Sequence, residues 1–413
     1  MHILFVHQNF PGQYRHILRA LSSQGGHTLI GLGINPLSEE LPNGVQYQQY
    51  MVNRGNTFGI HDHLLDLDSK LIRGEACAQH AIKLRDKGFN PELICAHVGW
   101  GEALFLKDIW PNSPMIAYQE FFYNATGFDL GFDPEFSSAS ILNDIARARF
   151  KTLNPLLMLE VSDWNITPTR FQKSTYPLQY HPRISVIHDG IDTQLAQPNL
   201  RTSPLKLDNG LTLSANQSIV TFVNRNLEPY RGCHSFIRSI PYIQDYSPGT
   251  KIVVVGSPDG TGYGAQSGDI SWRDTFLAEI TDCYDPALVH FVGCLDYLKF
   301  IHLLQLSSCH VYLTYPFVLS WSLLEAMSIG CAIVGSSTAP VQELIVSGHN
   351  GLLVDFFSPK DISRAVATIL QEPDLAFKLG KNARESILAK YSIEKCLPLH
   401  LSLMQLVASG GLT

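Results

Sequence analysis

The stretch from Leu323 to Gly335 decides the fold, and it reads LLEAMSIGCAIVG. It predicts a short helix with one carboxylate, Glu325, near its start, a stop at Gly330 and then a buried strand. A helix start suits an anionic ligand because unpaired backbone N–H groups and the helix dipole both favour negative charge. The alternative is a capping box, Ser322-x-x-Glu325, in which the glutamate only satisfies the helix end.

Short apolar, β-branched runs of the same kind recur along the chain, each followed by a helix-like segment. Continuous apolar runs that alternate with helices are typical of buried parallel strands. Two sets of such runs predict an α/β protein with two Rossmann-like domains. The predicted strands are Ile3–Val6, Leu29–Leu32, Leu93–Ala96, Met115–Tyr118, Trp164–Thr167 and Ile184–Ile187, then Ile219–Val223, Ile252–Val255, His290–Val292, Val311–Thr314, Ala332–Val334 and Gly351–Val354.

The boundary between the domains is expected in the polar, proline-bearing segment Gln197–Asn216. We therefore divide the chain into domains at 1–200 and 201–390. Residues 391–413 have apolar positions close to helical spacing, which predicts a C-terminal amphipathic helix.

The composition narrows the class of protein. The 413 residues carry a net charge of −7, with 45% hydrophobic and 16% charged residues, which is typical of a soluble globular protein. The charge argues against nucleic-acid binding, which usually needs a basic face. No apolar run reaches the ~18 residues of a membrane span and the N-terminus reads as a first strand, so we expect a cytoplasmic protein. Peripheral membrane contact is compatible with this composition.

Metal and disulfide chemistry gain little support from the sequence. The eight cysteines are scattered without a close Cys-x-x-Cys pair, which favours reduced, mostly buried thiols. His61-x-His63 has metal-like spacing but lacks convincing carboxylate or cysteine partners. We therefore predict no metal and no cofactor.

Two segments at predicted strand ends are placed to contact a ligand. Gly12 follows the first strand, where a glycine lets the backbone approach a ligand. The segment FVNRNLEPYRG, residues 222–232, follows the first strand of the second half and places Arg225 and Arg231 there. Arginine suits a diphosphate because its planar fork donates two parallel hydrogen bonds. The alternatives are a plain turn glycine and a solvated surface pair.

A third and a fourth group suit a sugar, whose hydroxyls need acceptors and whose apolar faces stack on rings. The loop YPFVLSWS, residues 315–322, precedes the helix of Glu325. In the first half, HVGWGE (97–102), QEFFY (119–123) and DLGFDPEF (129–136) combine aromatic rings with carboxylates near predicted strand ends. The alternatives are that Phe317 and Trp321 belong to the core and that the first-half blocks are packed loops.

These segments together resemble the retaining GT-B glycosyltransferases of family 4, over essentially the whole chain. The resemblance implies that the domains face a central cleft and that the C-terminal helix returns to the first domain. It implies that Glu325 binds the nucleotide ribose and that Arg225 and Arg231 clamp the donor phosphates. A further donor-binding set is Gly12, Gly256, Leu295, Val318, Leu319, Ser320 and Trp321, and an acceptor or sugar set is His97, Gly99, Glu102 and Tyr123.

Two departures from the family pattern concern the transferred sugar. Family members usually carry a sugar-facing glutamate eight positions before the helix glutamate, and here that position is Phe317. Many relatives have a histidine where this chain has Glu120. We therefore assign Glu120, with Arg225 and Arg231, to the catalytic set.

The resulting prediction is a hexosyltransferase that takes a UDP- or GDP-linked sugar and acts with retention of configuration. Its acceptor would be a glycan, a lipid-linked molecule or a small molecule. The competing interpretations are a nucleotide-sugar hydrolase or epimerase on the same fold, and a non-catalytic nucleotide-sugar-binding protein.

Overall fold

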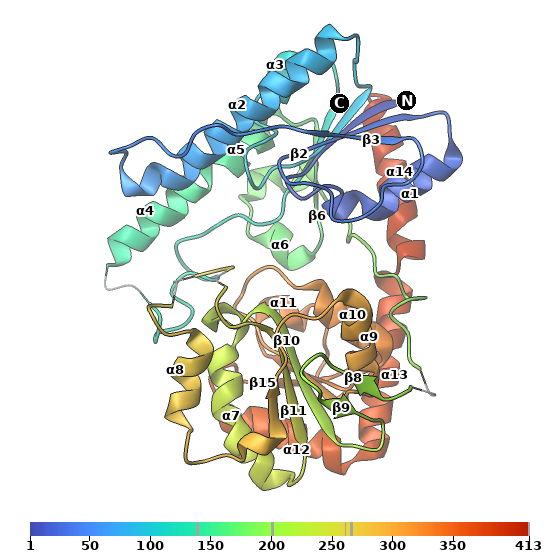
Figure 1. The fold of residues 1–413 in the computed structure, drawn as a ribbon. Helices are drawn as coiled ribbons and strands as arrows, with labels where there is room; N and C mark the ends of the chain where they lie inside the picture. Colours follow the sequence, from blue (N-terminus) through green and yellow to red (C-terminus); the bar gives the residue numbers. More distant parts are fainter. Residues whose placement is uncertain (138–139, 200–201, 261, 265–266, 412–413) are drawn as a thin grey trace. The chain divides into compact units, whose positions relative to one another are not determined.

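The computed structural model describes residues 1–137, 140–199, 202–260, 262–264 and 267–411. They form two compact units, and the chain passes between these units four times. Unit 1 comprises Met1–Gly131, Ser137–Gly190 and Ile393–Thr413, and unit 2 comprises Phe132–Phe136 and Ile191–Ser392. Each unit is described by itself below (Figure 1).

Unit 1 is built on a seven-stranded parallel sheet with the order β3-β2-β1-β4-β5-β6-β7. The strands are β1 (His2–Val6), β2 (Thr28–Gly33), β3 (Val45–Gln49), β4 (Leu93–His97), β5 (Met115–Tyr118), β6 (Trp164–Thr167) and β7 (Ile184–Val186). The order reverses between β1 and β4, and ligands of open α/β sheets bind at the carboxyl ends of the strands at such a point.

Helices cover both faces of the unit 1 sheet. Successive side chains of a strand point to opposite faces, so one strand packs with helices on both sides. Leu4 and Val6 pack with α2 and α3, whereas Ile3 and Phe5 pack with α1 and α14. Figure 1 shows α14, in red, running beside α1. The helices are η1 (Gly12–Tyr14), α1 (Arg15–Gln24), η2 (Asp62–Leu64), α2 (Leu65–Asp86), α3 (Leu106–Ile109), α4 (Ile141–Lys151), α5 (Leu153–Val161), α6 (Arg170–Ser174), η3 (Leu178–Arg183) and α14 (Ile393–Ala408).

Unit 2 repeats this architecture with a six-stranded parallel sheet of order β12-β11-β10-β13-β14-β15. The strands are β10 (Ile219–Asn226), β11 (Lys251–Ser257), β12 (Val289–Phe291), β13 (Cys309–Tyr312), β14 (Ile333–Ser336) and β15 (Leu352–Val354). The order reverses between β10 and β13. Two short antiparallel strands, β8 (Leu205–Lys206) and β9 (Thr212–Leu213), form a separate pair.

Both faces of the unit 2 sheet are also covered. Phe222 of β10 stacks on Phe236 of α7 with ring centroids 4.3 Å apart, and its neighbour Val223 packs on the other face with residues of α9 and α10. The helices are η4 (Pro229–Arg231), α7 (Cys233–Tyr246), α8 (Trp272–Glu279), η5 (Pro286–Leu288), α9 (Tyr297–Leu306), α10 (Trp321–Ile329), α11 (Ala339–Gln342), α12 (Pro359–Gln371) and α13 (Pro373–Lys390).

The predicted fold class is confirmed, and each of the predicted strands overlaps a strand of the structure. Strand β3 escaped prediction because it lies at the sheet edge, where its sequence Val-Gln-Tyr-Gln-Gln is half exposed and lacks an apolar run.

The units divide at Gly190/Ile191, before the predicted boundary segment. That segment instead packs into unit 2, because Leu205, Leu207 and Leu213 are buried in its core.

Two expectations from composition concern the cysteines and membrane-spanning helices. All eight cysteines are unpaired, as predicted, although Cys283 and Cys294 are exposed rather than buried. Within the described residues, every helix is too short or too polar to span a bilayer.

Candidate functional site

The predicted phosphate-binding arginines of unit 2 lie at the carboxyl end of β10 and just after it. Arg225 lies near the end of the strand and is exposed, whereas Arg231 ends η4 and is buried. Gly232 follows with φ +71°, and a Cβ there would lie 2.4 Å from Cβ of Leu313. A glycine is therefore needed for α7 to begin close to the end of β13.

The Arg231 side chain is held in a fixed orientation. Its Nη1 donates to Oγ1 of Thr314 at 2.9 Å and to the carbonyl oxygen of Val318 at 2.8 Å. The guanidinium also lies 5.3 Å from the ring centre of Tyr263 and 5.9 Å from that of Phe317. Phe317 therefore packs beside a cation at the position where the family carries a sugar-facing glutamate.

Glu228, which the sequence analysis did not select, organises the loop after β11. Its Oε2 accepts hydrogen bonds from the backbone N–H groups of Gly262 (2.7 Å) and Tyr263 (2.9 Å). Burial raises the pKa of this carboxyl, and the two N–H groups act in the opposite direction. Gly262 and Tyr263, in the loop after β11, are thus held beside Arg231.

The loop before α10 differs in part from prediction. The Val318 and Leu319 side chains are buried, and Trp321 is 39% exposed and therefore not a core residue. Ser320 belongs to the predicted donor-binding set, but its backbone N–H donates to Oη of Tyr312 at 2.9 Å. That donor is already used within unit 2.

The helix of Glu325 excludes the capping-box interpretation. Helix α10 starts two residues earlier than that interpretation requires, and its N-cap is Ser320, whose side chain accepts from the Ser322 N–H. Glu325 lies beyond the first turn, is 8% exposed, and its Oε1 accepts from Oη of Tyr297 at 2.7 Å. This tyrosine also escaped the sequence analysis, because it begins a different helix, α9.

Two further predicted donor-binding residues, Gly256 and Leu295, contribute to the packing of unit 2. A Cβ on Gly256 (φ +149°) would lie 2.9 Å from the carbonyl oxygen of Asn224, so the glycine permits the close approach of β11 to β10. Leu295 lies just before α9 and packs partly against the unit 2 core.

In unit 1, the structure brings His97 and Glu120 together at the ends of β4 and β5. The Gly99 N–H donates to Nδ1 of His97 at 3.1 Å, so the neutral ring carries its proton on Nε2. That Nε2 lies 3.9 Å from Oε2 of Glu120, whose side chain is 36% exposed. Burial, with His7 nearby, lowers the pKa of His97 well below its usual range.

Aromatic contacts fix the orientation of His97. Its ring stacks between Trp100, at 4.1 Å, and Tyr118, at 5.2 Å, and the edge of His7 lies 5.2 Å away. Gly12 has φ +50°, and a Cβ there would lie 2.4 Å from the His7 ring. Gly12 therefore makes room for the histidine at the end of β1.

The other predicted acceptor residues, Glu102 and Tyr123, have different surroundings. Glu102 is fully buried and its Oε1 accepts from Oη of Tyr50 at 2.9 Å, which favours a structural role against our prediction. Tyr123 lies under the ammonium of Lys151, 4.5 Å from the ring centre. The predicted 129–136 block is divided, because Phe132–Phe136 belongs to unit 2.

Among the described residues, one group has the geometry of a metal site. Ligand atoms of Asp133, Glu135 and His234 all lie within 4.8 Å of one another. Arg238 already donates to both oxygens of Glu135, at 2.6 and 2.7 Å, so this carboxylate has a cation. The arrangement reads as a hydrogen-bonded cluster within unit 2.

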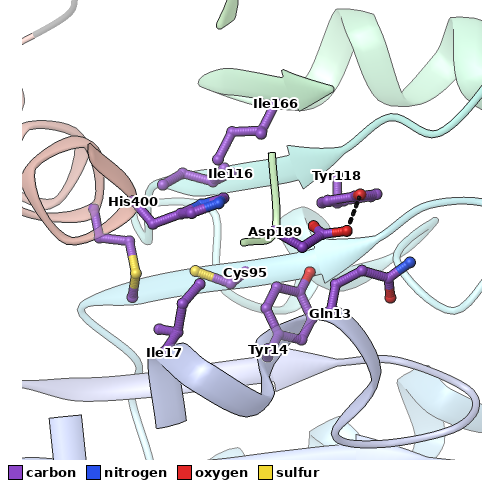
Figure 2. Close-up of a pocket in the computed structure, with 10 residues that line it drawn as sticks. Gln13, Tyr14, Ile17, Cys95, Ile116, Tyr118, Ile166, Asp189 and His400 are labelled. Atoms are coloured by element: carbon purple, nitrogen blue, oxygen red, sulfur yellow. Dashed lines mark hydrogen bonds between the residues drawn. The ribbon is translucent and has the colours of Figure 1, made fainter. Parts of the chain in front are cut away.

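Unit 1 contains a small cavity behind the end of β5 (Figure 2). Figure 2 shows Tyr14, Tyr118 and Asp189 converging on it, and Tyr118 Oη donates to Oδ2 of Asp189 at 3.2 Å. The volume of about 20 Å³ admits about one water molecule and no sugar. The lining residues are Gln13, Tyr14, Ile17, Cys95, Ile116, Tyr118, Ile166, Asp189, His400 and Met404.

A larger groove in unit 1 lies where η2 and the start of α2 meet α4. Its volume is about 430 Å³, within the range of ligand pockets. Its lining mixes hydrogen-bond donors and acceptors: His61, Asp62, His63, Leu65, Asp66, Asn143, Arg147 and Lys151. Lys151 connects this groove to Tyr123.

Solved structures resemble the whole chain in fold. Anabaena HepE, crystallised with UDP and glucose, aligns with a TM-score of 0.66 and 16% identity over 98% of this chain and 99% of its own. The sucrose-phosphate synthase of Thermosynechococcus elongatus aligns with a TM-score of 0.73 and 18% identity over 99% of this chain and all of its own.

Curated relatives match over shorter stretches. The D-inositol 3-phosphate glycosyltransferase of Corynebacterium glutamicum is 21% identical over 54% of this chain and 53% of its own length. An uncharacterized glycosyltransferase of Methanocaldococcus jannaschii is 32% identical over 26% of this chain and 28% of its own length. The chain thus spans about half or less of these relatives.

The family models match each half of the chain in turn. Residues 25–196 match the glycosyl transferase family 4 group, and residues 206–386 match glycosyl transferases group 1. With two Rossmann-like units of parallel strands and both arginines at the β10 end, the chain belongs to the GT-B glycosyltransferases of family 4.

Proposed function

We propose that this chain transfers a hexose from a UDP- or GDP-linked sugar to an acceptor, with retention of configuration and without a metal ion. The observation that carries the proposal is the buried Arg231, which Thr314 and Val318 hold at the carboxyl edge of the unit 2 sheet. Family membership supports the reaction class. The complexes of HepE with UDP and with UDP-glucose support a nucleotide-sugar donor.

In the proposed reaction, the bond between the anomeric carbon and the diphosphate breaks and negative charge grows on the leaving group. Arg225 and Arg231 neutralise that charge, and preorganised cations supply much of the rate in such sites. The acceptor oxygen forms a bond to the anomeric carbon on the same face of the sugar, and the leaving phosphate takes the proton of that hydroxyl. No side-chain nucleophile is required.

The acceptor is assigned to unit 1. His97, fixed as an Nε2–H donor, offers a hydrogen bond to a hydroxyl of the acceptor, and the half-exposed Glu120 beside it offers a carboxylate to the transferred sugar. The groove beside α4 offers room for the remainder of a glycan, lipid-linked or small-molecule acceptor. Its mixture of carboxylates, amide and cations suits polyhydroxyl ligands.

The deciding experiment screens UDP- and GDP-sugars for a rise in melting temperature and then follows the stabilising donor in turnover. Nucleotide release that requires an acceptor supports transfer. Free sugar produced equally without acceptor would show a hydrolase, and stabilisation without nucleotide release would show a binding protein.

A further inference from the structure

A five-residue segment from the first half of the chain belongs to unit 2, although the residues on both sides of it belong to unit 1. It reads Phe-Asp-Pro-Glu-Phe, residues Phe132–Phe136, and is called the inserted segment below. The Phe132 ring lies 5.0 Å from that of Tyr315, and the Phe136 ring lies 5.2 Å from that of Trp272. Aromatic packing therefore anchors both ends of the segment.

A surface ion pair adds a second attachment. Arg238 of α7 donates to both oxygens of Glu135, at 2.6 and 2.7 Å, and to both oxygens of Glu279, at 2.6 and 2.9 Å. The Arg238 and Glu135 side chains are 27% and 43% exposed, so solvent weakens the pair. It attaches the inserted segment to α7 and to Glu279 of α8, not to the loop whose oxygens accept from Arg231.

Asp133 makes a different, buried attachment. Its Oδ2 accepts from Oη of Tyr315 at 2.8 Å and lies 3.0 Å from Nε2 of His234. Its Oδ1 accepts from the Glu135 N–H at 3.0 Å. The Asp133 and His234 side chains are each 2% exposed. Hydrogen bonds to a buried carboxylate are strong, so Asp133 fixes the Tyr315 hydroxyl more firmly than ring packing alone.

Tyr315 lies in the loop that orients Arg231. Its neighbour Thr314 and the nearby Val318 supply the two oxygens that accept from Nη1 of Arg231. The Tyr315 N–H donates to the carbonyl oxygen of Tyr230 at 3.0 Å, next to Arg231 in sequence. A shift of Tyr315 would therefore move both the acceptors and the backbone of this arginine.

We propose that Asp133 is a positioning residue for the donor site. By holding Tyr315, it fixes the loop that carries both acceptors of Arg231, and so directs the guanidinium at the donor diphosphate. This role rests on the proposed function, because the diphosphate is the ligand that Arg231 would bind.

The test uses the full chain with Tyr315→Phe, Asp133→Ala and the double variant, and it measures melting temperature, affinity for UDP and GDP, and donor kcat and KM. Tyr315→Phe removes only the hydroxyl, so the fold should persist. We expect nucleotide affinity and kcat each to fall about tenfold, the order of one lost hydrogen bond to a charged group. The double variant should lose no more than Asp133→Ala, since both changes break one interaction.

The matched control is Arg238→Ala, which breaks the surface attachment of the same segment. It should leave kcat and nucleotide affinity within about twofold of the wild type, because a solvent-exposed ion pair contributes little to the free energy of folding. Wild-type kcat and affinity in Tyr315→Phe, additive losses in the double variant, or an equal loss in Arg238→Ala would each overturn the proposal. If Asp133→Ala fails to fold, Tyr315→Phe alone decides.

The two proposals fail in different ways. If the wild-type chain turns over no nucleotide sugar while Tyr315→Phe weakens UDP or GDP binding, transfer is wrong and the positioning role stands. If the wild type is active and Tyr315→Phe equals it, transfer stands and the positioning role is wrong.

Discussion

Arg225 and Arg231 have different surroundings, and the difference sets what their variants should do. Arg225→Ala removes an exposed cation, so turnover should fall about 100-fold while the free energy of unfolding is nearly unchanged. Arg231→Ala should lower turnover as much and also destabilise the fold by about 1–3 kcal/mol, because buried oxygens of Thr314 and Val318 lose their donor. Steady-state kinetics and urea unfolding measure both effects. Unchanged rates in both variants would remove the phosphate-clamp assignment.

Glu325 should control nucleotide affinity rather than the chemical step. A ribose contact is made about equally in the ground and transition states, so Glu325→Gln should raise the donor KM about tenfold with little change in kcat. Tyr297→Phe is the control, because it removes the hydroxyl that donates to Glu325 and leaves the carboxylate in place. A lower melting temperature with an unchanged donor KM would instead assign Glu325 to the packing of α9 on α10.

Glu120 should act on the transferred sugar. Glu120→Gln keeps the size of the side chain and the backbone carbonyl that accepts from Gln172 Nε2 at 2.7 Å. We expect turnover to fall about 100-fold while UDP and GDP bind as to the wild type, because those ligands lack the sugar. Kinetics, calorimetry and melting temperature on the one variant decide the matter. Near-wild-type turnover would refute the catalytic assignment.

At the level of elements, the groove between α2 and α4 makes the acceptor assignment testable. Arg147→Ala removes an exposed side chain from the groove wall, so the fold should be unaffected. The acceptor KM should rise about tenfold at an unchanged donor KM, because the groove lies in unit 1 and both arginines of the phosphate clamp lie in unit 2. Arg149→Ala, on the same helix but outside the groove lining, is the matched control. Equal effects of the two variants would contradict an acceptor role for the groove.

Elements with a strong local pattern were predictable from the sequence, and those that depend on distant partners were not. Buried strands such as β1 and β10 appear as continuous apolar runs because both of their faces are covered. Strand β3 lies at the edge of the sheet and contains three glutamines, so it lacks a continuous apolar run. The alternative interpretation of Glu325 placed the cap of α10 at Ser322 rather than at Ser320, because both are serines and the sequence does not show which side chain accepts.

The candidate site follows the same rule. The predicted strand ends placed Arg225 and Arg231 at and just after the end of β10, His97 at the end of β4 and Glu120 after β5. Glu228 was visible only as an acid between two arginines, and its partners lie more than thirty residues away in the loop after β11. No local pattern could show that Phe132–Phe136 belongs to unit 2, because its partners come from α7, α8 and the loop after β13.

For the whole molecule, buried histidines predict loss of stability in mild acid. Burial lowers the pKa of His7 to about 4, His188 to about 3, His310 to about 3 and His400 to about 4, and the pKa of His97 falls well below its usual range. Each pKa is depressed in the folded state, so each contributes stability above pH ~6.5, the unfolded value, and this contribution is lost as pH falls toward the folded pKa.

The expected loss is about 1 kcal/mol per histidine near pH ~5.5, measured by urea unfolding across the range from about pH 7.5 to 5. Glu102 and Glu228 act oppositely, because burial raises the pKa of both and the folded state then binds protons more tightly. A free energy of unfolding that stays level across this range would contradict the prediction.

The path of the chain has a consequence for protein engineering. Residues 191–392 leave and return at neighbouring points: the Ile191 N–H donates to the carbonyl oxygen of Tyr391 at 2.8 Å, and a Cβ on Gly190 would lie 3.0 Å from Cα of Ile393. The stretch is therefore suited to excision as one piece, with a short splice closing the remainder. The excised piece would lack Phe132–Phe136, so the rings of Tyr315 and Trp272 would lose their aromatic partners Phe132 and Phe136. A synthetic peptide with that sequence would complement it in trans, as the smaller partner of a split protein.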